Sequence, residues 1–177
     1  MSAKKALFVG LLLLTFGLTY YFVEFPVASR TNTTQGEVYK VDKVVDGDTL
    51  EITRYGRSEK IRLIGIDTPE TVNPRKPQQC FGAQASDYTK SLLTGRSVRL
   101  EFDPVVGERD KYNRLLAYVW LDEKMVNDLL VSGGYAHEYT YRSQAYKYQT
   151  QFKQAESSAR QNELGFWSKA TCGGVTK

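Results

Sequence analysis

The sequence predicts an α+β fold that is mainly β, in which a small barrel carries three helices and follows an N-terminal hydrophobic helix. Three observations predict it. Short runs of alternating apolar residues are separated by turn residues, later segments have helical spacing, and one long uncharged run begins near the N-terminus. With 177 residues, the chain is long enough for one domain and a tail.

The uncharged run covers residues 6–23 and follows Lys4 and Lys5. As a helix it would be about 27 Å long, close to the hydrocarbon thickness of a bilayer. It fits a cleavable signal peptide or an uncleaved transmembrane anchor, and both place the remainder outside the cytoplasm. A buried core helix is less well supported, because the run lacks a polar face. The predicted organisation is a signal peptide or anchor (1–29), a linker (30–35), a domain (36–169) and a C-terminal tail (170–177).

Three strands are expected in the first half of the domain, at residues 36–45, 49–53 and 60–66. The first two are joined by Asp46-Gly47-Asp48, a strong hairpin signal. The third is apolar on both faces near its end, as in a closed barrel or a sandwiched sheet.

Two more strands and three helices are expected in the second half. The fourth strand alternates, with Phe102 facing inward, and the last helix has apolar and small residues at helical spacing. This order of elements fits a five-stranded barrel of the OB type. The expected helices cover 82–93, 126–131 and 144–161, and the expected strands cover 96–102 and 115–121.

The formal net charge of +4 permits a polyanionic partner without demanding one. The two cysteines, Cys80 and Cys172, are expected to form a disulfide in an extracytoplasmic domain. Two free buried thiols are the alternative.

Four carboxylates and one arginine lie close together in the sequence, near the ends of apolar strands: Asp46, Asp48, Asp67, Glu70 and Arg62. Their mutual repulsion would be offset by a bound cation. Oxygen ligands suit a hard cation such as Ca²⁺ or Mg²⁺ rather than zinc. Alternatively, the acidic pairs are solvated or cap turns, and the arginine forms a structural ion pair.

Strict strand alternation would place Arg62 and Asp67 on opposite faces. The two can meet only if Asp67 lies beyond the strand end or if Gly65 marks a bulge. Pro69 restricts Thr68 to an extended conformation, which makes the Thr68 carbonyl a further candidate ligand.

A later loop contains Asp110-Lys111-Tyr112-Asn113-Arg114. Asn113 tolerates a left-handed conformation, which suits a tight turn that aims Arg114. Two arginines, a metal site and a carboxylate that activates water are together typical of phosphoryl transfer.

Other chemistries have little support in this sequence. The single histidine, His137, excludes a multi-histidine zinc site, and neither a G-x-S-x-G motif nor a P-loop is present. A run of tyrosines that includes Tyr139 and Tyr141 fits either base stacking or ordinary packing.

From about residue 36 to residue 168, the sequence resembles the staphylococcal-nuclease-like (thermonuclease) family in its motifs and in their order and spacing. The motifs are Val45-Asp46-Gly47-Asp48-Thr49, Ile61-Arg62-Leu63, Ile66-Asp67-Thr68-Pro69-Glu70-Thr71, Asp110-Lys111-Tyr112-Asn113-Arg114-Leu115-Leu116-Ala117-Tyr118, Lys124-Met125-Val126-Asn127 and Leu164-Gly165-Phe166-Trp167-Ser168.

The resemblance implies an OB-fold barrel with three helices and Ca²⁺-dependent hydrolysis of DNA and RNA. It also implies a role for each matched residue. Asp48, Asp67 and the Thr68 carbonyl would bind Ca²⁺, with Asp46 acting through water, and Glu70 would be the general base or orient water. Arg62 and Arg114 would bind phosphate and stabilise the transition state, Lys111 and Tyr112 would contact phosphate, and Tyr139 and Tyr141 would lie on the substrate side.

We therefore expect a monomeric, secreted or membrane-anchored nuclease with little sequence preference. Residues 6–23 would hold it in the membrane if they are not cleaved. Two other hypotheses are a non-catalytic OB-fold module that binds nucleic acid and a membrane-tethered protein-interaction domain. Neither needs a base beside a metal site.

Overall fold

The computed structural model describes residues 37–71 and 77–176. The apolar run at residues 6–23 lies outside the described residues. Within the described ranges, no helix has the length and hydrophobicity needed to cross a membrane.

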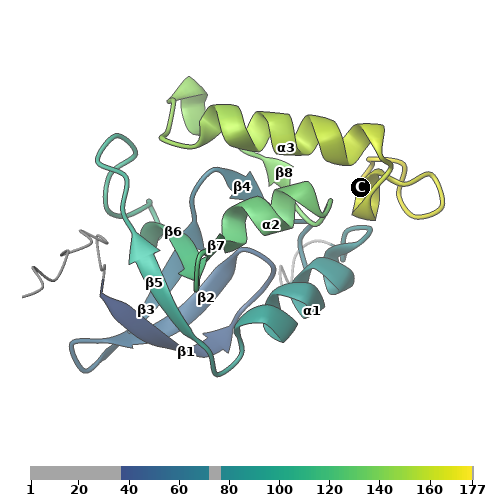
Figure 1. Ribbon diagram of the computed structural model, residues 1–177. Coiled ribbons are helices and arrows are strands. Elements are labelled where there is room, and N and C mark those ends of the chain that lie inside the picture. The colour runs from purple at the N-terminus through teal and green to yellow at the C-terminus, as the bar shows by residue number, and fades with distance from the viewer. Residues whose placement is uncertain (1–36, 72–76, 177) are drawn as a thin grey trace, which may run out of the picture. The chain divides into compact units, whose positions relative to one another are not determined.

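Five strands form a closed, mixed β-barrel (Figure 1). Four neighbouring pairs are antiparallel: β1 with β2, β2 with β3, β1 with β5, and β5 with β6. The parallel pairing of β3 with β6 closes the barrel. The barrel strands are β1 (Val38–Val44), β2 (Thr49–Arg54), β3 (Arg57–Leu63), β5 (Ser97–Glu101) and β6 (Leu115–Leu121).

Three short strands complete the β-structure. β4 (Ile66–Asp67) pairs with β8 (His137–Glu138) outside the barrel, and β7 (Lys124–Met125) forms a hairpin with β6. In the β4–β8 pair, Asp67 lies opposite His137, so this pairing fixes the backbone of Asp67.

Three helices pack around the barrel: α1 (Gly82–Leu93), α2 (Val126–Ser132) and α3 (Gln149–Gln161). α1 packs against β1, and α2 contacts both β6 and α3 (Figure 1). Inward-facing aliphatic side chains such as Leu50, Ile61 and Leu115 are fully buried and form one core with residues of α2 and α3. Two single turns of 3-10 helix lie at Tyr141–Ser143 and Gly165–Trp167.

The predicted bounds of β6 and α1 agree with the structure, but the third predicted strand is split. β3 ends at Leu63, and Gly65 has a φ of 75° before β4 begins. A Cβ at Gly65 would lie 2.5 Å from the Tyr146 ring, so both the backbone conformation and the space require glycine.

Two further expectations were wrong. Phe102 lies beyond the end of β5 and is 40% exposed, with the Arg54 guanidinium over its ring. The last helix begins at Gln149 rather than at residue 144. The Lys147 amide donates a hydrogen bond to Asp103 instead of joining a helix, so tertiary contacts override the helical pattern there.

Candidate active site

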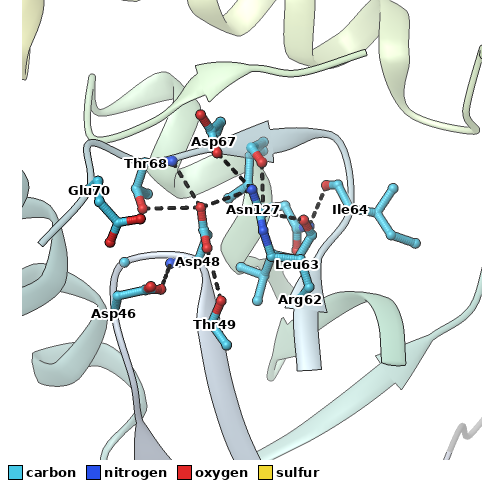
Figure 2. Close-up of polar contacts among 12 residues, drawn as sticks. Asp46, Asp48, Thr49, Arg62, Leu63, Ile64, Asp67, Thr68, Glu70 and Asn127 are labelled. Atoms are coloured by element: carbon cyan, nitrogen blue, oxygen red, sulfur yellow. Dashed lines mark hydrogen bonds and ion pairs between the residues drawn. The ribbon is translucent and has the colours of Figure 1, made fainter. Parts of the chain in front are cut away.

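Asp48 lies at the centre of the site, in the turn between β1 and β2 (Figure 2). Its side chain is almost inaccessible, because the residue is only 6% exposed. Oδ2 accepts hydrogen bonds from the Thr68 amide at 3.0 Å and the Thr68 hydroxyl at 3.2 Å. Oδ1 accepts one from the Thr49 hydroxyl at 3.1 Å. A buried carboxylate with this many donors has one fixed orientation.

Arg62 bridges the two predicted metal-binding carboxylates (Figure 2). Its Nη2 lies 3.1 Å from Asp48 Oδ2 and 2.8 Å from Asp67 Oδ1. Its Nη1 donates to the carbonyl oxygens of Leu63 at 2.9 Å and Ile66 at 2.8 Å. The break after β3 therefore brings Arg62 and Asp67 together despite strand alternation.

Two residues to which the sequence analysis gave no such role hold this break in place. Asn127 is fully buried, accepts a hydrogen bond from the Val119 amide and donates one to the Ile64 carbonyl, both at 2.9 Å. The Tyr146 hydroxyl donates to Glu138 Oε1 at 2.8 Å and lies 3.2 Å from the Gly65 carbonyl oxygen. In the sequence, Asn127 stood out only as the last residue of the motif Lys124-Met125-Val126-Asn127, without a role assigned to it.

Asp46 and Glu70 complete the acidic group. Asp46 accepts a hydrogen bond from the Asp48 amide at 3.2 Å. Burial raises the pKa of Asp46 to about 6, and repulsion from Asp48 acts in the same direction. Glu70 Oε1 accepts from the Thr71 amide at 3.0 Å. In the view of Figure 2, Asp46 and Glu70 are drawn on one side of Asp48 and Arg62 on the other.

The oxygen atoms of Asp48 and Asp67 fit a hard cation in chemistry and partly in geometry. Both approach the same nitrogen of Arg62, so they lie near each other. Desolvation raises the pKa of Asp67, and the positive charge of Arg62 opposes this rise. Among the described residues, no group of three or more Asp, Glu, His and Cys side chains is arranged to hold a metal ion. The Thr68 carbonyl and water would have to supply the remaining ligands.

Arg114 is placed at the start of β6 by the turn before it. Asn113 has the expected left-handed conformation, with φ 64°. Asp110 accepts from the Arg114 Nε at 2.7 Å and its amide at 3.0 Å. Burial alone would raise the pKa of Asp110, but its hydrogen bonds with Arg114 keep that pKa below its ordinary value.

A chain of polar contacts joins the two arginines. Arg114 Nη1 donates to the Thr49 hydroxyl at 3.3 Å, and that hydroxyl donates to Asp48, which in turn contacts Arg62. The register of the barrel explains this, since Thr49 of β2 lies opposite Arg62 of β3. Thr49 belongs to the motif Val45-Asp46-Gly47-Asp48-Thr49, but the contact of its side chain with Arg114 was not predicted.

Both arginines line a cleft of about 470 Å³ beside the acidic group. Tyr112, Tyr139 and Tyr141 are exposed in it by 68%, 44% and 47%, so their rings are open to a ligand. Asp46, Asp48, Thr68 and Glu70 do not line the cleft, and Arg62 connects the two parts of the site. The predicted residues that line it are Arg62, Asp67, Lys111, Tyr112, Arg114, Tyr139 and Tyr141.

The two cysteines do not line this cleft. Cys80 and Cys172 form the predicted disulfide, which joins positions 92 residues apart in the sequence.

Most of the chain is similar to known proteins of one family. Residues 60–169 match the family model described as staphylococcal nuclease homologue. The chain is 39% identical to a thermonuclease of Staphylococcus hyicus, over 93% of this chain and 99% of that one. It is 38% identical to a thermonuclease of Staphylococcus intermedius over the same shares. A prophage-derived endonuclease of Bacillus subtilis, YokF, is 42% identical over 73% of this chain and 43% of its own length. The chain therefore belongs to the staphylococcal nuclease family.

Proposed function

We propose that this chain is a nuclease that hydrolyses phosphodiester bonds of DNA and RNA with the help of one Ca²⁺ ion. The observation that carries the proposal is the link from Arg62 through Asp48 and Thr49 to Arg114. This link joins two guanidinium groups that line one cleft, next to the buried carboxylate of Asp48. The family relationship and the thermonuclease relatives support the same activity.

The two arginines act on the phosphate. A guanidinium presents paired N–H donors that match phosphate oxygens, and its charge stabilises the negative charge that grows in the transition state. Arg62 is kept in place by two carboxylates and two carbonyls, and Arg114 by Asp110 and Thr49. Both donors are thus oriented before substrate arrives.

Glu70 acts as the general base or orients the attacking water. Asp48, Asp67 and the Thr68 carbonyl would hold Ca²⁺, and Asp46 would contact it through water. The ion would supply positive charge beside the scissile phosphate when bound.

Little sequence preference follows from the character of the cleft. Lys111 and Tyr112 would contact phosphate, and the exposed rings of Tyr139 and Tyr141 would stack on bases. Phosphate contacts and stacking do not depend on the base, so DNA and RNA are both accepted.

The enzyme would act outside the cytoplasm as a monomer with an OB-type barrel. Its disulfide supports an oxidising compartment. Residues 1–29 would be a signal peptide or would anchor the protein in the membrane through residues 6–23.

Digestion of plasmid DNA and of RNA by the purified full chain, with Ca²⁺ or with a chelator, tests the proposal. Chelator-sensitive cleavage is expected, and Glu70→Gln should abolish most of it. Glu123→Gln, an exposed glutamate in the β6–β7 turn, is the matched control and should be as active as the wild type. Binding of nucleic acid without cleavage would instead identify a non-catalytic module, to which the exposed tyrosines are equally suited.

A further inference from the structure

Gln79 holds the backbone of Glu70 through two hydrogen bonds. The Glu70 amide donates to Gln79 Oε1 at 2.7 Å, and the Gln79 amide donates to the Glu70 carbonyl at 3.0 Å. The start of α1 packs on the same point, because a Cβ at Gly82 would lie 2.9 Å from the Glu70 carbonyl oxygen. The position of Glu70 therefore depends on the segment immediately before α1.

That segment is fastened to the C-terminal end of the domain. Cys80, the residue after Gln79, is bonded to Cys172, with 6.0 Å between the two Cα atoms. The turn that carries Cys172 is itself anchored, since the Thr171 hydroxyl donates to the Gly165 carbonyl at 2.6 Å and the Gly174 amide to the Phe166 carbonyl at 2.8 Å. Phe166 is fully buried, so the disulfide joins the Gln79 segment to a fixed support.

Phe81 shows that the segment is held against its local preference. Its φ of 68° lies in the left-handed region, which is uncommon for a residue other than glycine. Its ring packs on Tyr135, with 5.7 Å between centroids, and on Phe166, at 6.5 Å. The packing of the Phe81 ring and the disulfide at the neighbouring Cys80 together hold Phe81 in this left-handed conformation.

We infer that Gln79 and the Cys80–Cys172 disulfide form a device that positions Glu70, so that turnover depends on the oxidation state of this cysteine pair. This inference rests on the role proposed above for Glu70. Gln79 and the cysteines are positioning residues, and none of them is required to touch the substrate. A small displacement of a catalytic group lowers the rate of the chemical step far more than it weakens substrate binding.

Reduction by a dithiol would break the Cys80–Cys172 disulfide and so free the Gln79 segment from the C-terminal turn. The reductant supplies two electrons and two protons, the Sγ–Sγ bond breaks to give two thiols, and the dithiol becomes a cyclic disulfide. The Gln79 segment then loses its covalent support while Gly82 and α1 remain in place.

The test measures kcat and KM for DNA cleavage with the full chain, purified in detergent. The variants are Cys80→Ser/Cys172→Ser, Gln79→Met and Gln79→Glu, each made with Glu70 and with Glu70→Gln. Gln79→Met removes the acceptor oxygen at similar size, whereas Gln79→Glu keeps an acceptor. Gln161→Met, on the exposed face of α3, is the matched control for Gln79→Met.

We expect kcat to fall about tenfold to a hundredfold in the double-serine variant and in Gln79→Met, with KM nearly unchanged. Gln79→Glu and Gln161→Met should retain most of the activity. Treatment of the wild type with dithiothreitol should reproduce the double-serine result and leave the double-serine variant unaffected. With Glu70→Gln, none of these changes should lower kcat further, because the group being positioned is absent.

Equal losses with Glu70 and with Glu70→Gln would refute the inference, as would an unchanged kcat in Gln79→Met. If the double-serine variant fails to fold, Gln79→Met still decides, since it leaves the disulfide intact. A wild type without chelator-sensitive cleavage would instead overturn the proposed function, so the two failures are distinguishable.

Discussion

Asn127→Ala is the perturbation whose cost can be worked out most directly from the structure. The side chain is fully buried and satisfies two backbone groups from different elements, the Val119 amide in β6 and the Ile64 carbonyl after β3. Alanine leaves both without this partner in the protein interior. Each unsatisfied buried group costs about 1–3 kcal/mol, so the free energy of unfolding should fall by about 2–6 kcal/mol.

The same change should reach the active site. Ile64 lies in the chain between Leu63 and the β4 residues Ile66 and Asp67, and these three neighbours all contact the Arg62 guanidinium. Loosening the Ile64 backbone disturbs that arrangement, so kcat should fall as well, by about tenfold or more.

Urea unfolding followed by circular dichroism measures the first effect, and DNA cleavage under folding conditions measures the second. Asn162→Ala is the matched control, because Asn162 is exposed and its side chain bonds only to neighbouring Ser158 within the described contacts. The free energy of unfolding of Asn162→Ala should be less than about 1 kcal/mol below that of the wild type. A loss for Asn127→Ala no larger than that of the control would show that the two buried hydrogen bonds of Asn127 do not stabilise the fold.

Three further predictions concern Arg62, the disulfide and the response to acid. Arg62→Lys should lower kcat about a hundredfold in a cleavage assay, since one ammonium cannot make the contacts of two guanidinium nitrogens, and the exposed Arg57→Lys should not. Reducing Cys80–Cys172 should lower the free energy of unfolding by about 3–5 kcal/mol in denaturant titrations, because the bond closes a loop of 92 positions; no shift in midpoint would contradict this. Burial alone would raise the pKa of Asp103, but hydrogen bonds from two backbone amides and the Tyr118 hydroxyl lower it. Ionised Asp103 therefore makes its full contribution to the free energy of unfolding above its unfolded-state pKa of about 4. This contribution is lost as the pH falls through its folded-state pKa, so the stability of Asp103→Asn should fall less steeply in acid than that of the wild type.

The barrel could be predicted from the sequence because its signals are local. Alternation of apolar residues marks the strands, and the Asp-Gly turn after Val45 marks the first hairpin. The bounds of α1 and β6 follow from helical and apolar runs that end at turn residues. The meeting of Arg62 with Asp67 was predicted on the condition that Asp67 lies beyond the strand end or that Gly65 marks a bulge. In the structure, β3 ends at Leu63, so Asp67 lies beyond its end, and Gly65 has a positive φ.

The contacts that sequence reasoning missed are tertiary contacts. Thr49, Gln79 and Asn127 each bond to a group that lies in another element or across a loop, and nothing in their neighbours in sequence reveals this. The start of α3 was misplaced for the same reason, since Asp103 lies 44 positions before the Lys147 amide that it captures. Local sequence patterns thus predicted the helices and strands, whereas the hydrogen bonds that hold the site residues in place form only once the barrel has closed.

The role proposed for Glu70 in cleavage is tested most directly by the single-turnover rate at which a short DNA duplex is cleaved with Ca²⁺, compared between the wild type and Glu70→Gln. Affinity for the same duplex is measured in parallel by fluorescence anisotropy. We expect a rate at least about a hundredfold lower in Glu70→Gln, with affinity little changed. Equal rates for the two proteins would contradict the role proposed for Glu70.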